Sequence, residues 1–314
     1  MKRLLVIRFS ALGDVAMVVP VVRALAEQYP ELEITMLSQQ RMADLFAGLP
    51  KNVRFHGVNL QTQSLREMIA GLGTYDYVAD LHGVWRSMVI RWAMRLRGAN
   101  VKTIQKGRFS RFLLTHKISR KPLKNTILRY CDTFKRLGFI LDTPHVPLST
   151  AGKGIGIAPF AAHTGKVYPL ERMERVVELL SQQGERIVLF GAGSKEQEIL
   201  EAWSKNYPNV ESVAGRYSLG EELEMMRGLR VMLSMDSANM HLASLVGTRV
   251  VSVWGATHPW AGFVGIGQRE SDCIQRKDLP CRPCSIYGNK KCTFGDYRCM
   301  DISPEEIVQR ISIA

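Results

Sequence analysis

Short apolar runs alternate along the chain with stretches in which apolar positions recur every three or four residues. In the first half the runs predict strands at residues 4–9, 33–37, 53–58 and 77–81. The helical repeats predict helices at residues 16–28 and 85–96. Strands that alternate with helices are typical of a parallel sheet covered on both faces.

The same alternation restarts in the second half. It predicts strands at residues 155–159, 186–191, 210–213, 231–235 and 249–254. It predicts helices between them at residues 170–182, 195–206, 219–229 and 238–246. A last helix is predicted at residues 303–313, with Ser303 as N-cap, Pro304 first in the helix and Glu306 three residues after the cap.

The two runs meet at residues 143–154, a stretch of prolines, glycines and small polar residues that is typical of a linker. We therefore predict an α/β protein of two doubly wound, Rossmann-like domains, residues 1–150 and 151–314, that face a shared cleft. We expect the C-terminal helix to pack back on the first domain. Ligands of such sheets bind outside the carboxyl ends of the strands, so the loops there are where chemistry is expected.

The net charge of +13 is concentrated in one part of the chain. Residues 1–150 contain 23 Lys and Arg against 10 Asp and Glu, whereas the remainder is balanced. Residues 86–136 contain 15 basic side chains and one acid, Asp132. Such a field recruits a phospholipid surface, a phosphorylated glycolipid or a nucleic acid, and the plainer interpretation is a solvated face that serves solubility.

The N-terminal apolar run is interrupted by Arg8 and then by Gly13 and Asp14, without a cleavage site of small residues. We interpret it as a strand and a turn rather than a signal peptide. No apolar stretch approaches the roughly 20 residues that a membrane span needs. These features predict a cytoplasmic protein.

The turn after the first strand is Ser10-Ala-Leu-Gly-Asp14. Gly13 permits a tight turn with close backbone approach. Asp14 is then either an N-cap of the next helix or a general base that takes a proton from an acceptor hydroxyl. The glycine spacing is not G-x-G-x-x-G, so a dinucleotide site is not expected.

Two loops of the second half offer polar groups after a strand. Thr164, Gly165 and Lys166 suit a diphosphate, as hydrogen-bond donors and a cation, or form an ordinary solvent loop. Glu196 follows a glycine-rich turn. It either accepts hydrogen bonds from ribose hydroxyls or complements the macrodipole of its helix.

The segment Asp236-Ser-Ala-Asn-Met-His241 gives the sharpest signal. It lies where a strand enters a helix whose first amides are free to bind an anion, and Ser237 adds a hydroxyl there. Asp236 is placed to cap the helix and to bind sugar hydroxyls. His241 is either within reach of the same ligand or a structural histidine.

Five of the six cysteines lie near the C-terminus, whereas Cys131 stands apart. The spacing of Cys281, Cys284, Cys292 and Cys299 is compatible with a structural four-thiolate zinc site. The alternative is a set of reduced, partly buried thiols.

Several of these segments together resemble glycosyltransferase family 9, the heptosyltransferases of lipopolysaccharide core assembly. The similar segments run in the family's order. They are Ser10-Ala-Leu-Gly-Asp14-Val with Pro20, Asp80-Leu81 with Arg86-Ser87, Gly165-Lys166-Val-Tyr-Pro169, Gly191-Ala-Gly-Ser, Asp236-Ser-Ala-Asn-Met-His241-Leu-Ala, and Trp254-Gly-Ala-Thr257-His-Pro259. Two departures concern the donor: Ala238 stands where the family usually has Gly, and Tyr168 where Trp is common.

The resemblance implies a GT-B fold with the donor in the C-terminal domain and an inverting transfer that needs no metal for its chemistry. It implies that Asp14 is the catalytic base and that Lys166 neutralises the donor diphosphate. It further implies a heptose from ADP-heptose as the transferred sugar. The implied donor-binding residues are Thr164, Gly165, Glu196, Asp236, Ser237, Ala238, Asn239 and His241.

With this resemblance, the basic first half of the chain is expected to bind an anionic, lipid A-type acceptor at the inner-membrane surface. Candidate acceptor contacts are Ser10, Gly13, Arg86, Lys106, Arg108, Arg111, Arg120, Lys121 and Lys124. Two other hypotheses compete with this one. The first is a basic nucleic-acid-binding protein with a structural zinc element, against which stands the lack of an aromatic-interleaved basic motif. The second is a relative that binds donor without turnover.

Overall fold

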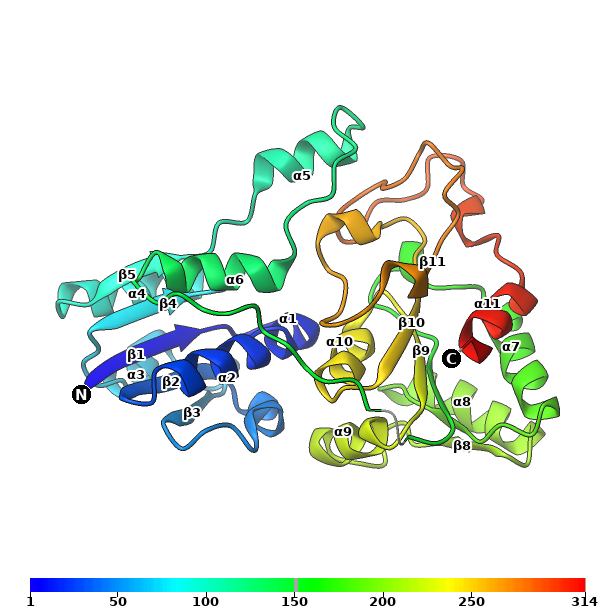
Figure 1. Cartoon of the computed structure of the whole chain (residues 1–314), viewed down its shortest axis with the longest axis horizontal. Helices are drawn as coiled ribbons and strands as arrows, with labels where there is room; N and C mark the ends of the chain where they lie inside the picture. The colour runs from blue at the N-terminus through cyan, green and yellow to red at the C-terminus, as the bar shows by residue number, and fades with distance from the viewer. Residues whose placement is uncertain (150–151, 314) are drawn as a thin grey trace. The chain divides into compact units, whose positions relative to one another are not determined.

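The computed structural model describes residues 1–149 and 152–313 (Figure 1). The chain forms two compact units, Met1–Lys106 with Lys124–His145, and Gly107–Leu123 with the chain from Val146 onward. The predicted boundary between residues 150 and 151 lies outside the described residues. The sequence did not indicate that residues 107–123 belong with the second unit.

The first unit contains a five-stranded parallel sheet in the order β3-β2-β1-β4-β5. Its strands are β1 (Lys2–Ile7), β2 (Leu32–Gln39), β3 (Val53–Val58), β4 (Tyr77–Asp80) and β5 (Asn100–Thr103). Its helices are α1 (Leu12–Ala16), α2 (Val19–Gln28), the 3-10 helix η1 (Gln40–Phe46), α3 (Leu65–Ala70), α4 (Trp85–Leu96) and α6 (Thr126–Lys135).

The predicted helix at residues 16–28 is two helices in the structure. Pro20 is the second residue of α2, where its missing N–H costs no hydrogen bond, and the chain between Ala16 and Val19 is a turn. The break lets α1 begin at Leu12, four residues earlier than predicted. Asp14 therefore lies inside the first turn of α1, with Ala11 as the N-cap.

The second unit contains a six-stranded parallel sheet in the order β11-β10-β9-β6-β7-β8. Its strands are β6 (Ile155–Ala158), β7 (Ile187–Leu189), β8 (Val210–Ser212), β9 (Val231–Met235), β10 (Arg249–Val253) and β11 (Cys273–Ile274). Its α-helices are α5 (Arg108–Thr115), α7 (Leu170–Gln182), α8 (Ser194–Asn206), α9 (Leu219–Arg227), α10 (Ala238–Leu245) and α11 (Pro304–Ser312). Its 3-10 helices are η2 (Thr164–Lys166), η3 (Pro259–Ala261), η4 (Glu270–Asp272) and η5 (Arg298–Met300).

Both sheets are doubly wound, which confirms the predicted fold class. In each sheet the strand order reverses between two central strands, β1 and β4 in the first and β6 and β9 in the second. A reversal of this kind opens a crevice at the carboxyl ends of the two strands, where open α/β sheets bind ligands. The loops after β1, β4, β6 and β9 are therefore the places to look for a site.

Helix α5 belongs to the second unit because it packs there through one buried residue. Leu114 clusters with Ala261 and Ile286, and Leu123 N–H donates to the carbonyl of Trp260 at 2.8 Å. These contacts join residues more than a hundred positions apart in the sequence. Local patterns cannot report such a contact.

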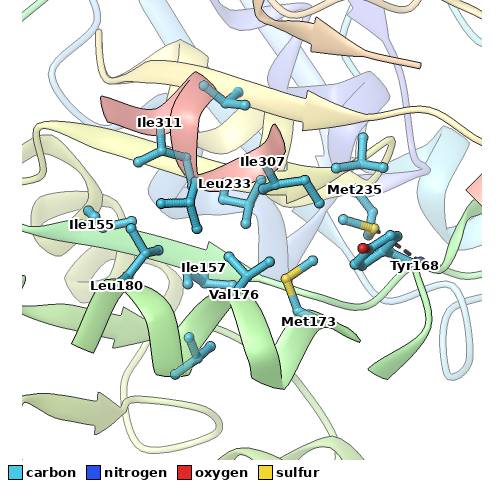
Figure 2. Close-up of a cluster of buried hydrophobic side chains, with 14 of the residues drawn as sticks. Ile155, Ile157, Tyr168, Met173, Val176, Leu180, Leu233, Met235, Ile307 and Ile311 are labelled. Carbon is cyan, nitrogen blue, oxygen red and sulfur yellow. Dashed lines mark hydrogen bonds between the residues drawn. The ribbon is translucent and has the colours of Figure 1, made fainter. Parts of the chain in front are cut away.

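The C-terminal helix α11 packs within the second unit, and the expected packing on the first unit stays a prediction. Ile307 and Ile311 are fully buried in the main core of the second unit, and α11 packs on α7. Figure 2 shows them directed into the same cluster as Met173 and Val176. The Tyr168 hydroxyl donates to the carbonyl of Ile302 at 2.6 Å, just before α11, and helps to fix the tail there.

We predict that Ile311→Ala lowers the free energy of unfolding by about 2–5 kcal/mol, because it leaves a cavity in this core. The measurement is urea unfolding of the full chain. Ile313→Ala is the matched control, since that side chain is 53% exposed, and it should change stability by less than about 0.5 kcal/mol. Equal effects of the two substitutions would contradict the placement of α11.

Candidate active site

The turn after β1 fixes Asp14 through a buried arginine. Arg8 Nη2 lies 2.8 Å from Asp14 Oδ2, and its Nη1 donates to the carbonyl of Leu81 at 2.7 Å. Arg8 is only 7% exposed. The N–H of Ala11 donates to the same Asp14 oxygen at 3.3 Å, so the carboxylate is held in one orientation at the end of β1.

The turn after β4 lies beside it and is organised by Asp80, which is fully buried. Its two oxygens accept four bonds, from the backbone N–H groups of His82 and Gly83, the hydroxyl of Ser87 and the guanidinium of Arg91. These four donors satisfy both oxygens of the buried carboxylate. Asp80 therefore shapes the turn.

His82 is a residue of this site that the sequence reasoning missed. Its Nε2 lies 3.5 Å from the Ser10 hydroxyl, and its Nδ1 lies 3.4 Å from the Phe9 backbone N–H. Burial, and then the nearby charge of Arg8, lower the pKa of His82 to about 4. The imidazole is thus neutral at pH 7. Its position directly after a strand end was the available signal.

The candidate acceptor residues are distributed over both units. Ser10, Gly13, Arg86, Lys106 and Lys124 belong to the first unit, whereas Arg108, Arg111, Arg120 and Lys121 belong to the second.

Several of these cations already have partners within their own unit. Lys106 donates to the carbonyl of Gly83, and Lys124 pairs with Asp132 at 2.6 Å. Arg111 donates to the Tyr287 hydroxyl at 2.7 Å and lies over the ring of Phe263. Arg120 contacts the carbonyl of Pro280 at 3.5 Å.

In the second unit the loops after β6 and β9 meet in an ion pair. Lys166 Nζ lies 2.9 Å from Asp236 Oδ2, and the Thr257 hydroxyl donates to the same oxygen at 2.8 Å. The side chain of Lys166 is 16% exposed and that of Asp236 is 6% exposed. The lysine is thus the more accessible member of the pair and is positioned before any ligand arrives.

The structure corrects the predicted role of Asp236 as a helix cap. The N-cap of α10 is Ser237, whose side chain makes no capping bond and instead lies 3.1 Å from the Ser234 hydroxyl. Ala238 and Asn239 are the first two residues of α10. His241 follows in the same turn and is 8% exposed. The start of the helix keeps its backbone N–H groups available to an anion.

The backbone approaches Lys166 closely, and two glycines make this possible. A Cβ on Gly165 would lie 2.8 Å from Ala256 Cβ and 3.0 Å from the carbonyl oxygen of Gly288. A Cβ on Gly288, which has φ +76°, would lie 2.7 Å from Lys166 Cγ. The cysteine-rich segment therefore packs directly against the lysine.

Glu196 lies in the first turn of α8, as the plainer interpretation predicted. Its Oε2 accepts the backbone N–H of Ala192 at 2.8 Å and so closes the glycine-rich turn after β7. Its role toward a ribose stays a prediction.

Arg282 supports this site, and no sequence pattern indicated it. Its guanidinium is 6% exposed, and burial lowers its pKa to about 10. All five of its N–H donors have acceptors. These acceptors are the carbonyl oxygens of Trp254, Gly255, Thr257 and Arg276 and the side-chain oxygen of Gln275. Arg282 thereby fixes the loop that presents Thr257 to Asp236.

Among residues 1–149 and 152–313, no three His, Cys, Asp or Glu side chains form a group that could hold a metal ion. The structure thus does not assemble the thiols of the predicted zinc site, and zinc binding stays a prediction. Burial raises the pKa of Cys299 to about 11 and also raises that of Cys284. The Cys299 thiol is therefore protonated at pH 7.

The sequence profile described as glycosyltransferase family 9 (heptosyltransferase) matches residues 63–294, which is most of the chain. The protein belongs to glycosyltransferase family 9. It is therefore a glycosyltransferase, and this assignment leaves the nucleic-acid-binding alternative without support.

Relatives in family 9 align over nearly the whole chain. Lipooligosaccharide heptosyltransferase 2 of Campylobacter jejuni is 25% identical over 324 residues, covering 96% of this chain and 95% of that protein. The solved structure of Escherichia coli ADP-heptose lipopolysaccharide heptosyltransferase II gives a TM-score of 0.72 at 18% identity, covering 99% of this chain and 97% of that chain. The structure of E. coli heptosyltransferase WaaC with ADP-2-deoxy-2-fluoro heptose gives a TM-score of 0.67 at 19% identity, covering 91% of this chain and 97% of that chain. These structures share the fold.

In the part of the family 9 chain that the structure describes, no helix is both long and apolar enough to cross a membrane.

We predict that Arg282→Met destabilises the fold by about 3 kcal/mol or more, because several buried carbonyls lose their donors. Urea unfolding measures the change. Arg298→Met lies in the same segment at a side chain that is 48% exposed, and it should cost at most about 1 kcal/mol. If Arg282→Met lowers the free energy of unfolding no more than Arg298→Met does, the buried hydrogen bonds of Arg282 do not support the site.

Proposed function

We propose that this enzyme transfers a heptose from ADP-heptose, with inversion, onto a lipid A-type acceptor of the lipopolysaccharide core. The observation that carries the proposal is the ion pair of Lys166 with Asp236 beside the start of α10. It places a cation and free helix amides together where β6 and β9 diverge. That combination is suited to a nucleotide diphosphate. Of the relatives named above, one E. coli structure is of an ADP-heptose lipopolysaccharide heptosyltransferase, and the other contains an ADP-heptose analogue.

The proposed donor chemistry follows from the charges. A diphosphate entering this site offers Lys166 two negative groups in place of one carboxylate. Asp236 keeps the Thr257 hydroxyl as a donor and is then free to accept bonds from sugar hydroxyls. Lys166 and the amides of α10 stabilise the charge that develops on the leaving diphosphate.

Asp14 is the proposed general base. Both of its contacts, from Arg8 and from the Ala11 N–H, end on Oδ2, which leaves Oδ1 to take the proton of the acceptor hydroxyl. The side chain is 26% exposed, so an acceptor can reach it. The neutral imidazole of His82 neighbours the turn without adding a charge.

A lipid A-type acceptor places the reaction at the cytoplasmic face of the inner membrane. The concentration of basic residues in 86–136 supports this location, since that leaflet is anionic. The same residues fit an acceptor that carries phosphates. We propose the exposed Arg86 as one of its contacts.

We predict that ADP or ADP-heptose at 100 times its dissociation constant stabilises the protein by about 2.7 kcal/mol. Lys166→Ala should remove most of this ligand-dependent increment, whereas Lys205→Ala, an exposed lysine on α8, should leave it unchanged. The ligand-dependent stabilisation is measured by thermal unfolding of each variant with and without ligand. This comparison is needed because loss of Lys166 also leaves a buried carboxylate unpaired and so lowers the stability of the ligand-free protein. Stabilisation by UDP or GDP sugars alone would overturn the donor assignment.

Asp14→Asn should leave donor binding intact and lower the transfer rate by about 10²–10⁴-fold, the usual contribution of a general base. The rate is followed as ADP release in the presence of acceptor. If the unmodified protein binds donor but releases no more ADP than a reaction without protein, it is a donor-binding relative without turnover. A variant rate equal to that of the unmodified protein would exclude Asp14 as the base.

A further inference from the structure

Helix α4 (Figure 1) presents apolar side chains on two opposite faces. Its inner face carries Ile90 and Met94, which are fully buried in the core of the first unit. Its outer face carries Trp85, Trp92 and Leu96, which are 63%, 57% and 86% exposed. We call these three residues the outer face of α4.

Helix geometry shows that core packing does not explain the outer face. At about 100° per residue, Trp85, Trp92 and Leu96 fall within about 40° of one another. Met94 lies about 180° from Trp85 on the same wheel. Large apolar side chains gathered on a solvent-facing stripe mark an interaction surface, whereas scattered ones need no explanation.

The borders of this stripe are basic. Arg86 and Arg95 are exposed on its two sides and form no ion pair among the described residues. The other two arginines of the segment serve the fold: Arg91 binds Asp80, and Arg97 donates to backbone carbonyls. The stripe thus lies in a positive field that the fold leaves uncompensated.

We propose that the outer face of α4 binds the surface of an anionic phospholipid bilayer, with its tryptophans at the level of the headgroups. Tryptophan is enriched at membrane interfaces, and an amphipathic helix with basic borders lies in that plane. Basic residues near an anionic leaflet add electrostatic attraction to it. A second copy of the chain fits less well, because both copies carry a net charge of +13.

This inference deepens the proposed function by naming the surface that meets the membrane. It rests on that function only for the identity of the membrane. Vesicle binding is measured without donor or acceptor, so either idea can fail alone.

The test is co-sedimentation of the full chain with vesicles of phosphatidylethanolamine and phosphatidylglycerol, compared with phosphatidylcholine vesicles. We expect binding to the anionic vesicles only, reduced about tenfold or more in Trp85→Ser/Trp92→Ser and weakened in Arg95→Glu. Ile140→Ser is the matched control, since Ile140 is 68% exposed in the same unit but outside α4, and it should bind as the unmodified protein does.

A second readout does not depend on losing binding. Quenching of tryptophan emission by bromine-labelled lipid should be strong in the unmodified protein and mostly lost in Trp85→Phe/Trp92→Phe, because Trp203 and Trp254 are buried and Trp260 is partly buried. Anionic-vesicle binding that is unchanged in Trp85→Ser/Trp92→Ser would overturn the proposal. A drop in oligomeric mass in that variant would also overturn it, since the face would then be a protein interface.

Discussion

The parallel pairing of β6 with β9 is the constraint on which the proposed donor site of this enzyme depends. Ala158 is level with Ser234 at the carboxyl ends of the two strands, so the chain leaves both strands at one edge of the sheet. The strands come from opposite sides of the reversal in strand order, and their loops therefore open toward the same crevice. The contact of Lys166 with Asp236 follows from this register.

The cysteine-rich segment acts in the structure as a support for that contact. Arg282 holds the carbonyls of the loop after β10, and that loop presents Thr257 to Asp236. A buried guanidinium without a carboxylate partner is stable only because every N–H has an acceptor. The rigidity of the proposed donor site thus depends on residues that lie outside the sequence motifs predicted to bind the nucleotide.

The sequence predicted the parts of this fold that local physics determines. Val231–Met235, a buried and mostly apolar strand, was predicted at its observed bounds, as was Val53–Val58, in which polar residues interrupt the apolar ones. Helix α11 was recognised by its Ser303 cap. Prediction from the sequence failed where residues far apart in the chain contact one another. The unit to which α5 belongs, the packing of α11 on α7 and the partners of Asp236 depend on tertiary contacts that have no local signature. Lys166 and Asp236 were found from their motifs, whereas Arg282 and His82 were not.

The proposed reaction moves heptose from ADP-heptose to a lipid A-type glycolipid. The most direct measurement is mass spectrometry of a heptose-deficient acceptor incubated with the purified protein and ADP-heptose. We expect a product heavier by one heptose residue, with ADP released in equal amount. An acceptor of unchanged mass, from a protein shown to bind ADP-heptose, would contradict it.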